Sequence, residues 1–376
     1  MLSFWEKNSF LKYDHIIIGG GIVGLSTACS IKEKNPAAEI LILERGIFPT
    51  GASTKNAGFA CFGSLTEILS DINLNGEGQT LTLIEKRWKG INRLRERLGD
   101  DDIGFLNYGG YELINEQFLP AVERVSQVNT LLRPIFESDV FELKNSSIKE
   151  FGFNDSFVKA LVYSPFESQL DTGKMMRSLM RYAASLGVNV ITGCDVAGFE
   201  DDGSGSVKVN ASHNILKQDV IFSTGRLIIC ANAFIDKILP GSGIKPGRGQ
   251  VVATKPIDGL KFRGIFHMDE GFYYFRNFGS RVIFGGGRNL DFKGEQTTDF
   301  AYSDLILNDL KEKLDMVILP DTSYEIEDSW SGIMAFNENK LPEIKQVSQN
   351  VLSVMSCNGM GVALSSVTGD EVAEMI

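Results

Sequence analysis

The sequence predicts an α/β fold, with a Rossmann-like, dinucleotide-binding domain on a parallel sheet and a second, α+β domain on an antiparallel sheet. Three observations predict it. A β-branched run at 16–18 leads directly into a glycine turn and a helical pattern. Apolar strands and helical patterns then alternate, which is typical of a parallel sheet. Residues 245–290 change character, because short strands there are separated only by turn residues.

The first strand, turn and helix together form a nucleotide site. Gly19, Gly21 and Gly24 have the GxGxxG spacing, which permits a tight turn, close approach of the backbone to a pyrophosphate and close packing of the helix. The phosphates then lie at the positive end of the helix that begins near Ile22. The next strand ends in Glu44, where a carboxylate can accept both hydroxyls of an adenosine ribose. This combination predicts a bound dinucleotide.

The elements that follow alternate between loop, helix and strand. Residues 45–63 are rich in small and turn-forming residues, as expected of a loop that runs beside a ligand. Residues 80–100 place apolar side chains at helical spacing and end at a glycine. We then expect an extended piece at 105–114 and a helical stretch over 122–132.

Further strands and helices complete the parallel sheet. Asp171 caps a helix predicted over 171–186, and residues 188–200 alternate like a strand. Residues 219–234 are expected to hold two more strands, the second being the continuous apolar run typical of a buried parallel strand. A terminal helix is predicted after Gly361.

Composition argues against several classes of partner. The 48 acidic residues outnumber the 37 basic ones, giving a formal net charge of −11, and no basic run is long enough to follow a nucleic-acid backbone. The five cysteines are odd in number and never form a CxxC pair, which favours reduced thiols and no metal site. Eighteen apolar residues never run together, and the N-terminal residues lack a basic start before an apolar run. We therefore predict a cytoplasmic protein with no nucleic-acid partner and no transmembrane segment.

Seven segments, in order along the chain, resemble the D-amino acid oxidase (DAO) family of flavoproteins, which includes glycine oxidase, sarcosine oxidase and gamma-glutamylputrescine oxidoreductase. The resemblance spans nearly the whole chain. Each segment alone is weakly specific, whereas the ordered set is a strong signal. The segments are GGGIVG at 19–24, GASTKNAG at 51–58, the helix and strand at 170–190, ANAF at 231–234, PGRGQ at 246–250, WSGIMAFNENKLPEI at 330–344 and the terminal segment at 357–376.

This resemblance implies that the dinucleotide is FAD. It implies contacts from residues 51–58 to the pyrophosphate and isoalloxazine, and it places Val196 at the adenine. Gly359 and Gly361 precede a helix whose amino end can face the pyrimidine edge of the flavin, where negative charge develops on reduction. FAD is expected to be non-covalent, because the attachment cysteine of sarcosine oxidase relatives has no counterpart after Trp330. The predicted FAD contacts are Gly19, Gly21, Ile22, Val23, Gly24, Glu44, Arg45, Ser53, Thr54, Asn56, Ala57, Gly58, Val196, Ala231, Gly332, Asn358, Gly359, Met360, Gly361, Val362 and Ala363.

The two domains are predicted to be discontinuous in sequence, because nucleotide-type segments occur at both ends of the chain and in its middle. The FAD-binding domain comprises residues 1–75, 155–235 and 322–376. The substrate domain comprises residues 76–154 and 236–321.

The family implies hydride transfer to flavin N5 from a carbon that bears an amine, giving an imine that water hydrolyses. Such chemistry needs positioning and exclusion of water more than a strong acid or base, which suits a chain with three histidines. We therefore predict a FAD-dependent amine or amino acid oxidoreductase. Its partners are expected to be a small amine, an N-substituted amino acid or a D-amino acid, and an electron acceptor that is oxygen, a quinone or another carrier.

The sequence departs from the family pattern at positions that bind the substrate and at a position that acts on the electron acceptor. Glycine oxidase binds the substrate carboxylate through the arginine of a WxGxR segment, which is Met334 here, and sarcosine oxidase uses a lysine that is Ala363 here. A simple α-amino acid held in the usual way is therefore less expected. The oxygen-activating lysine of sarcosine oxidase matches an aliphatic position near Ile283, which leaves oxidase and dehydrogenase equally open. The candidate substrate-pocket residues are Arg248, His267, Tyr274, Arg276, Met334 and Lys340.

Two other functions fit the same scaffold. One is a FAD-dependent dehydrogenase of hydroxy acids or of glycerol 3-phosphate, which needs a base to deprotonate an alcohol; the scarcity of histidine argues weakly against it. The other is a flavin-binding subunit without turnover of its own, since a fold does not establish activity.

Overall fold

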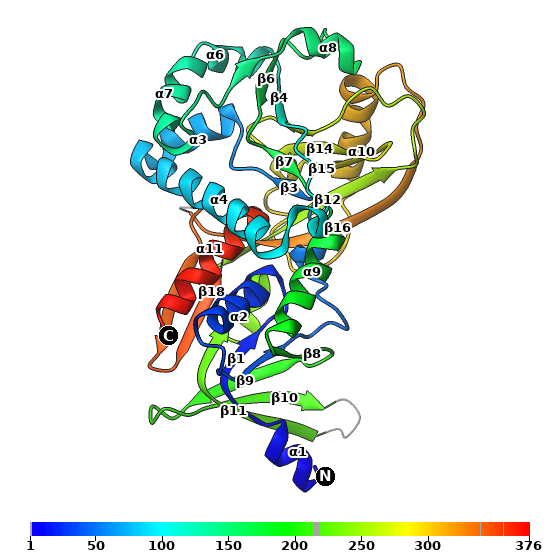
Figure 1. The fold of residues 1–376 in the computed structure, drawn as a ribbon. Helices are drawn as coiled ribbons and strands as arrows, with labels where there is room; N and C mark the ends of the chain where they lie inside the picture. The colour runs from blue at the N-terminus through cyan, green and yellow to red at the C-terminus, as the bar shows by residue number, and fades with distance from the viewer. Residues whose placement is uncertain (1, 214–217, 339, 356) are drawn as a thin grey trace.

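The computed structural model of the protein describes residues 2–213, 218–338, 340–355 and 357–376. The molecule is elongated, with one sheet in the lower part of Figure 1 and a second sheet in the upper part. Helices α4 (Glu77–Leu98) and α11 (Gly361–Glu374) lie between them and pack against each other. The short helix α1 (Phe4–Ser9) forms the lower tip.

The first sheet is built around β1 (Lys12–Ile18), which pairs in parallel with β2 (Ile40–Leu43) and β11 (Gln218–Ile229). The order across the sheet is β17-β18-β11-β1-β2-β8. Parallel pairing continues outward to β18 and β8, while β17 is antiparallel to β18. The predicted parallel sheet is therefore confirmed. The outer strands are β8 (Asn189–Ile191), β17 (Glu343–Ser348) and β18 (Val351–Met355).

Side chains alternate along β1 and enter two separate cores, as expected of a strand that is buried on both faces. Ile17 packs with helices α2 (Ile22–Lys34), α9 (Thr172–Ser185) and α11. Ile16 and Ile18 pack on the other face. That face is covered by a ribbon of β9 (Val196–Asp201) and β10 (Val207–His213), which runs antiparallel to the first half of β11.

The second sheet has the order β16-β12-β15-β14-β13-β4-β6-β5, and its pairs are antiparallel except for β4 with β13. This confirms the antiparallel sheet predicted from residues 245–290. One face packs against α10 (Asp304–Lys313), and the other packs against α3 (Leu65–Asn75) and α7 (Val125–Phe136). Its strands are β4 (Gly110–Ile114), β5 (Glu142–Leu143), β6 (Ala160–Ser164), β12 (Lys245–Thr254), β13 (Ile265–Met268), β14 (Tyr273–Phe278), β15 (Arg281–Gly286) and β16 (Ile326–Phe336).

Shorter elements connect these layers. The strands β3 (Phe59–Ala60) and β7 (Ser168–Gln169) pair with each other as a small ribbon. The remaining short helices are α5 (Asp100–Ile103), α6 (Leu119–Val122), α8 (Ser146–Phe151) and the 3-10 turns η1 (Ala52–Thr54), η2 (Glu116–Phe118), η3 (Asn232–Lys237) and η4 (Arg288–Leu290), with a π-helical turn, η5 (Leu314–Ile318), after α10.

Three predicted elements are wrong in detail. Residues 219–234 hold one long strand and η3, because the first half of β11 pairs with β10 and the second half with β18, so the strand continues through its polar middle. Residues 188–200 split into β8 and β9 at a turn in which Gly193 has a φ of +67°. The helical stretch over 122–132 is the junction of α6 and α7.

Two strands from the segments predicted to form the FAD-binding domain pair in the second sheet. Both β6 and β16 belong to the second sheet, although the segments predicted to bind FAD include them. The sequence of β16 is ambiguous because the strand serves both sheets: Ile333 and Ala335 pack in the core of the first sheet, while its backbone pairs with β12. The domain boundaries stay a prediction.

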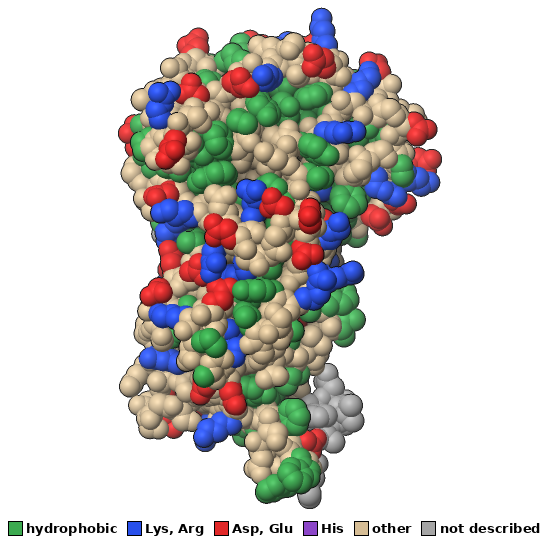
Figure 2. Space-filling view, viewed as in Figure 1, with side chains coloured by type: hydrophobic (Ala, Val, Ile, Leu, Met, Phe, Trp, Pro, Cys, Tyr) green, Lys and Arg blue, Asp and Glu red, His purple; other side chains and the backbone are tan. Residues whose placement is uncertain are grey.

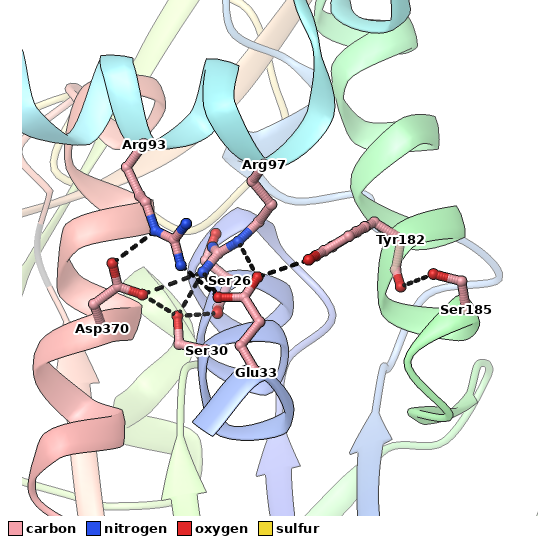
Figure 3. Close-up of polar contacts among 8 residues, drawn as sticks. All are labelled: Ser26, Ser30, Glu33, Arg93, Arg97, Tyr182, Ser185 and Asp370. Atoms are coloured by element: carbon pink, nitrogen blue, oxygen red, sulfur yellow. Dashed lines mark hydrogen bonds and ion pairs between the residues drawn. The ribbon is translucent and has the colours of Figure 1, made fainter. Parts of the chain in front are cut away.

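A network of charged side chains fastens α4 onto the helices of the first sheet (Figure 3). The buried Arg97 of α4 donates to Glu33 of α2 at 2.9 Å and to Asp370 of α11 at 3.2 Å. Arg93, one turn earlier, bonds the same two carboxylates. Tyr182 of α9 donates to Glu33 at 2.9 Å, so four helices meet at this carboxylate and its partners.

The surface gives no sign of a single dominant charge on the face drawn in Figure 2, where Lys and Arg are interspersed with Asp and Glu. Hydrophobic side chains are visible at the lower tip, where α1 exposes Phe4 and Trp5 next to charged and polar residues. Within the described ranges, no helix is long and apolar enough to cross a membrane.

Candidate active site

A single large cavity of about 670 Å³ lies where the two sheets meet, among the residues that the structure describes. Its walls come from the turn after β1, the end of β2, the loop that contains η1, the strands β12 and β16, and the residues before and at the start of α11. This size is within the usual range for a site that buries a small molecule or cofactor.

The turn after β1 is compatible only with glycine at two of its positions. Gly19 has a φ of +106°, and a Cβ there would come within 2.5 Å of the Cys230 carbonyl oxygen. A Cβ on Gly24 would come within 2.0 Å of the carbonyl oxygen of Gly19, so α2 packs directly on the turn. The Ile22 N–H at the start of α2 donates to Ser53 Oγ at 2.8 Å, which leaves the Ser53 hydroxyl proton available to a phosphate.

Glu44 stands at the end of β2 and lines the cavity. Its two carboxylate oxygens accept N–H groups from Gly20 and Gly46, each at 2.8 Å. Each oxygen retains a further lone pair for a ribose hydroxyl. The guanidinium of Arg45, the next residue, lies over the ring of Phe234 at 4.3 Å, and both residues line the cavity, as does Val196.

The loop over 51–58 is fixed by the amide of Asn56. Its Oδ1 accepts the Gly58 N–H and the Thr172 hydroxyl, both at 2.9 Å, and its Nδ2 donates to the Ser53 carbonyl at 2.8 Å. The Trp330 indole N–H donates to the Lys55 carbonyl at 2.9 Å, which ties the loop to β16. The backbone beside the cavity is therefore held in place by contacts that point away from it.

The segment before α11 is locked in a similar way. Asn358 has a φ of +48°, and its Oδ1 accepts the Asn337 N–H at 3.0 Å while its Nδ2 donates to Asn337 Oδ1 at 2.8 Å. Helix α11 begins at Gly361, and its amino end lines the cavity. Burial raises the pKa of the neighbouring Cys357 thiol to about 12, so the thiol is protonated at neutral pH.

These features fit FAD. The two helix amino ends, at α2 and α11, offer N–H groups and positive partial charge to the pyrophosphate and to a ring that becomes negative on reduction. A Cβ on Gly21 would come within 2.9 Å of Ser53 Oγ, so side-chain atoms there would fill the space between turn and loop.

The opposite end of the cavity carries a histidine held by a carboxylate. His267 Nε2 lies 3.0 Å from Glu167 Oε2, and both side chains are buried. The other Glu167 oxygen accepts the N–H groups of Phe62 and Gly63, each at 3.2 Å. Burial alone lowers the pKa of His267, but the charge of Glu167 and its hydrogen bond outweigh burial, so the pKa lies above its ordinary value.

Three neighbours, Phe59, Tyr274 and Cys61, complete the wall around His267. Phe59 packs edge-on against His267 and against Tyr274, with ring centroids 5.4 and 5.7 Å apart, and burial raises the pKa of Tyr274 to about 12. Cys61 is close enough that its sulfur and the ligand atoms of Glu167 and His267 lie within 4.8 Å of one another. Burial raises the pKa of the Cys61 thiol well above its ordinary value, so we interpret this trio as a packed cluster and keep the prediction of no metal.

An ionised carboxylate also faces this end of the cavity. Glu67 of α3 lies 3.1 Å from Arg87 Nη1, which also donates to the Phe62 carbonyl. Burial raises the pKa of Glu67, but the positive charges of Arg87, Lys340 and His267 outweigh burial and hold it below its ordinary value. Lys340 itself forms an ion pair with Asp71.

Most predicted cofactor residues line this cavity, and three do not. Gly24 and Gly58 are packed against backbone, since a Cβ on Gly58 would come within 2.3 Å of the Leu170 carbonyl oxygen. Thr54 donates to the Pro49 carbonyl at 2.6 Å, inside its own loop. The predicted residues that line the cavity are Gly19, Gly21, Ile22, Val23, Glu44, Arg45, Ser53, Asn56, Ala57, Val196, Ala231, Gly332, Asn358, Gly359, Met360, Gly361, Val362 and Ala363.

Of the predicted substrate residues, His267, Tyr274, Met334 and Lys340 line the cavity, whereas Arg248 and Arg276 do not. Arg248 is buried in a bidentate ion pair with Glu295, at 2.8 and 2.6 Å. Arg276 Nη1 donates to the carbonyls of Gly58 and Leu170, at 2.9 and 2.6 Å. Both guanidinium groups are therefore committed to structural partners.

Among the cavity residues that sequence reasoning missed are Glu67, Arg87 and Arg288. Glu67 and Arg87 belong to helices whose patterns carried no chemical motif. Arg288 follows the glycines of FGGG at the end of β15, and this glycine run beside a charge was the available signal.

A glycine turn at a helix amino end, an acidic residue at the end of β2 and a second sheet that closes the cavity define a dinucleotide-dependent oxidoreductase fold. The family model described as "DAO: FAD dependent oxidoreductase" matches residues 14–375. The chain therefore belongs to the DAO family of FAD-dependent oxidoreductases, and its cofactor is FAD.

Individual relatives are distant. A protein of Haemophilus influenzae named "Probable oxidoreductase OrdL" is 24% identical, over 96% of this chain and 82% of its own length. The crystal structure of glycine oxidase from Geobacillus kaustophilus is 20% identical and has a TM-score of 0.75, covering 97% of this chain and 95% of that one. L-proline dehydrogenase from P. horikoshii is 18% identical with a TM-score of 0.75, covering 97% and 93%. These two structures support the fold.

Proposed function

We propose that this protein oxidises the C–N bond of a small amine, an N-substituted amino acid or a D-amino acid. The carbon that bears the nitrogen loses a hydride, the nitrogen loses a proton, and the resulting imine is hydrolysed by water to a carbonyl compound and an amine or ammonia. FAD, when bound, supplies the acceptor for the hydride. Oxygen, a quinone or another carrier then takes the two electrons.

The observation that carries this proposal is the ionised Glu67 in the cavity wall. A carboxylate that stays charged while buried favours a cationic ligand such as an ammonium group. Its Oε1 is engaged by Arg87, so Oε2 is the oxygen we assign to the substrate. A neutral alcohol would offer Oε2 no positive charge, whereas the Arg87 contact at Oε1 is the same with either ligand.

The environment of His267 is also compatible with amine oxidation. Glu167 raises the pKa of the imidazole and lies within hydrogen-bond distance of Nε2, so this nitrogen is engaged by Glu167 and the charged form of the ring is favoured. Hydride loss from a carbon next to nitrogen needs no base at that carbon, so a protonated His267 is compatible with amine oxidation. Tyr274 and Met334 provide the wall that excludes water on this side.

One observation favours a second candidate, oxidation of a hydroxy acid. The hydrogen bond between His267 and Glu167 is the arrangement in which a carboxylate orients a histidine base, and an alcohol substrate requires such a base. The raised pKa reduces the fraction of His267 that is neutral, and so free to act as a base, at any given pH.

The test is an anaerobic titration of the FAD-loaded protein with a panel of amines, amino acids and hydroxy acids, followed by admission of air. Bleaching of the flavin band by an amine is the expected result, and rapid recovery of colour in air then identifies an oxidase. Bleaching only by a hydroxy acid would support the second candidate and overturn the first. No bleaching by any compound would favour a flavin-binding subunit without turnover.

Glu67 can be tested in the same assay. We expect Glu67→Gln to lower kcat/KM for the amine about 10- to 100-fold, mainly through KM, because a charge-assisted contact is lost. Glu67→Asp keeps the charge and serves as the folding check, and Glu77→Gln, an exposed acid at the start of α4, is the matched control. Unchanged kinetics in Glu67→Gln would remove Glu67 from the proposal.

A further inference from the structure

Arg288 differs from the other arginines around the cavity in having aromatic neighbours on two sides. It begins η4, directly after the glycines at the end of β15, and it lines the cavity. Its guanidinium carbon lies 3.9 Å from the ring centroid of Phe336 and 4.9 Å from that of Phe292. Stacking on rings fixes the plane of a guanidinium without using its N–H groups.

These N–H groups have no protein partner. Among the residues that the structure describes, the Arg288 side chain forms no ion pair and no hydrogen bond. Glu295, the acid that influences it electrostatically, is bound by Arg248 through both oxygens and also accepts from Gln250. By contrast, Arg87 and Arg248 are paired with carboxylates. A half-buried, cavity-lining arginine whose donors have no partner among the described residues is suited to an anionic ligand.

Arg288 lies beside the cavity-facing side of β16. Gly332, Met334 and Phe336 alternate with the core residues of this strand and line the cavity together. Arg288 stacks on Phe336, the next same-face residue after Met334. Arg288 also lies close to β12, the neighbouring strand of the sheet. A Cβ on Gly247, which pairs with Met334, would lie 3.1 Å from Arg288 Nη1.

We propose that Arg288 binds a carboxylate of the substrate. This inference rests on the proposed function and narrows it: the substrate is an amine that also carries a carboxylate. Its ammonium group faces Glu67, which lies against Gly271, and its carboxylate faces Arg288, whose neighbour Phe292 lies against Phe272. The planar fork of the guanidinium receives both carboxylate oxygens.

The test measures binding of simple acids to the oxidised, FAD-loaded protein, without turnover. Sodium butyrate and sodium benzoate are titrated while the flavin absorbance is recorded, with butyramide, benzamide and inorganic phosphate as comparison ligands. We expect the acids to perturb the spectrum and the amides to bind at least about 10-fold more weakly. Absence of acid binding, or phosphate binding in preference to both acids, would overturn the assignment.

Variants locate the contact. Arg288→Gln should weaken acid binding about 10- to 100-fold while the FAD spectrum and FAD affinity stay unchanged, and Arg288→Lys should weaken it less, because charge is kept without the fork. Arg263→Gln is the matched control: it removes an exposed arginine that also lies over an aromatic ring, Tyr108. Equal acid affinity in Arg288→Gln and the unmodified protein would refute the proposal.

The two proposals fail separately. Amine oxidation with acid binding that does not depend on Arg288 would refute this inference and leave the proposed function standing. Acid binding that depends on Arg288, in a protein whose flavin no amine bleaches, would refute the proposed function and leave the carboxylate site standing.

Discussion

The carboxylate of Glu167 favours the charged form of the buried His267, because it raises the pKa of the imidazole. Burial by itself lowers the pKa of this histidine, yet Glu167 at 3.0 Å, with Glu112 and Glu67 further away, raises it by more. His15 on β1 is the opposite case: burial lowers its pKa, and the nearby Asp14 does not offset the effect. The contributions of the two histidines to the free energy of unfolding therefore change with pH in opposite directions.

We predict that the stability contributed by His267 declines as the pH rises. Its pKa in the folded protein is above the ordinary value of about 6.5, so its contribution is complete below that pH and is lost as the pH rises through the folded pKa. Urea denaturation of the FAD-loaded protein should show that His267→Gln lowers the free energy of unfolding by about 1–3 kcal/mol more at pH 6 than at pH 9.

His15→Gln is the matched control for this measurement. Its folded pKa is lowered, so the unfolded chain binds the proton more readily and the native His15 costs stability as the pH falls. The difference between His15→Gln and the unmodified protein should therefore change with pH in the opposite direction. A His267→Gln cost that is equal at both pH values would contradict the assigned protonation state.

Among the elements, α4 depends on its polar contacts with the first sheet. The Arg97 side chain is fully buried, and its Nη1 has no hydrogen-bond partner among the described residues. Its charge is therefore compensated by Glu33 and Asp370, while Ser30 accepts a further N–H. These contacts join helices that are far apart in sequence (Figure 3).

We predict that Glu33→Ala destabilises the protein by about 3–5 kcal/mol, because it leaves the buried Arg97 and the nearby Arg93 with Asp370 as their main counter-charge. Guanidinium denaturation at saturating FAD measures this. Glu85→Ala on α4, which removes an exposed pair with Lys89, should change stability by less than about 1 kcal/mol. Equal effects of the two variants would mean that the network adds little.

The sequence predicted those elements whose local signals agreed with their tertiary role. The turn after β1, the cap at Asp171 and the hairpins of 245–290 combine residue type with spacing, and all of them are present. The length of β11 was missed, because it depends on two different partner strands that its own residues do not specify. The pairing of β16 with β12 was likewise not predicted, since Ile333 and Ala335 of the same strand pack in the core of the first sheet.

The candidate site was predictable to different degrees at its two ends. The nucleotide end comes from contiguous motifs, and most of its predicted residues line the cavity. The substrate end is assembled from α3, α4, β13, β14 and η4, so a single arginine or glutamate in those segments carries no pattern. Arg248 and Arg276 were plausible by residue type alone, and only their partners Glu295 and Leu170 show that they are engaged elsewhere.

At the scale of the whole molecule, the cavity lies between the two sheets, and residues of both sheets line it. A cofactor bound there contacts elements that otherwise meet mainly through β16, α4 and α11. FAD binding should therefore add to the stability of the complete chain, since a ligand that binds only the folded state stabilises it by mass action.

We predict that FAD raises the free energy of unfolding by about 4 kcal/mol when the free FAD concentration is 1,000 times its Kd. Glu44→Ala should reduce this gain at the same FAD concentration by about 1.4–2.8 kcal/mol, because a 10- to 100-fold loss of affinity follows from losing the ribose contacts. Denaturation with and without FAD gives both values. Glu39→Ala, an exposed acid just before β2, should leave the gain intact. If Glu44→Ala instead destabilises the protein without FAD and leaves the gain unchanged, the carboxylate serves only to hold the Gly20 and Gly46 amides of the turn.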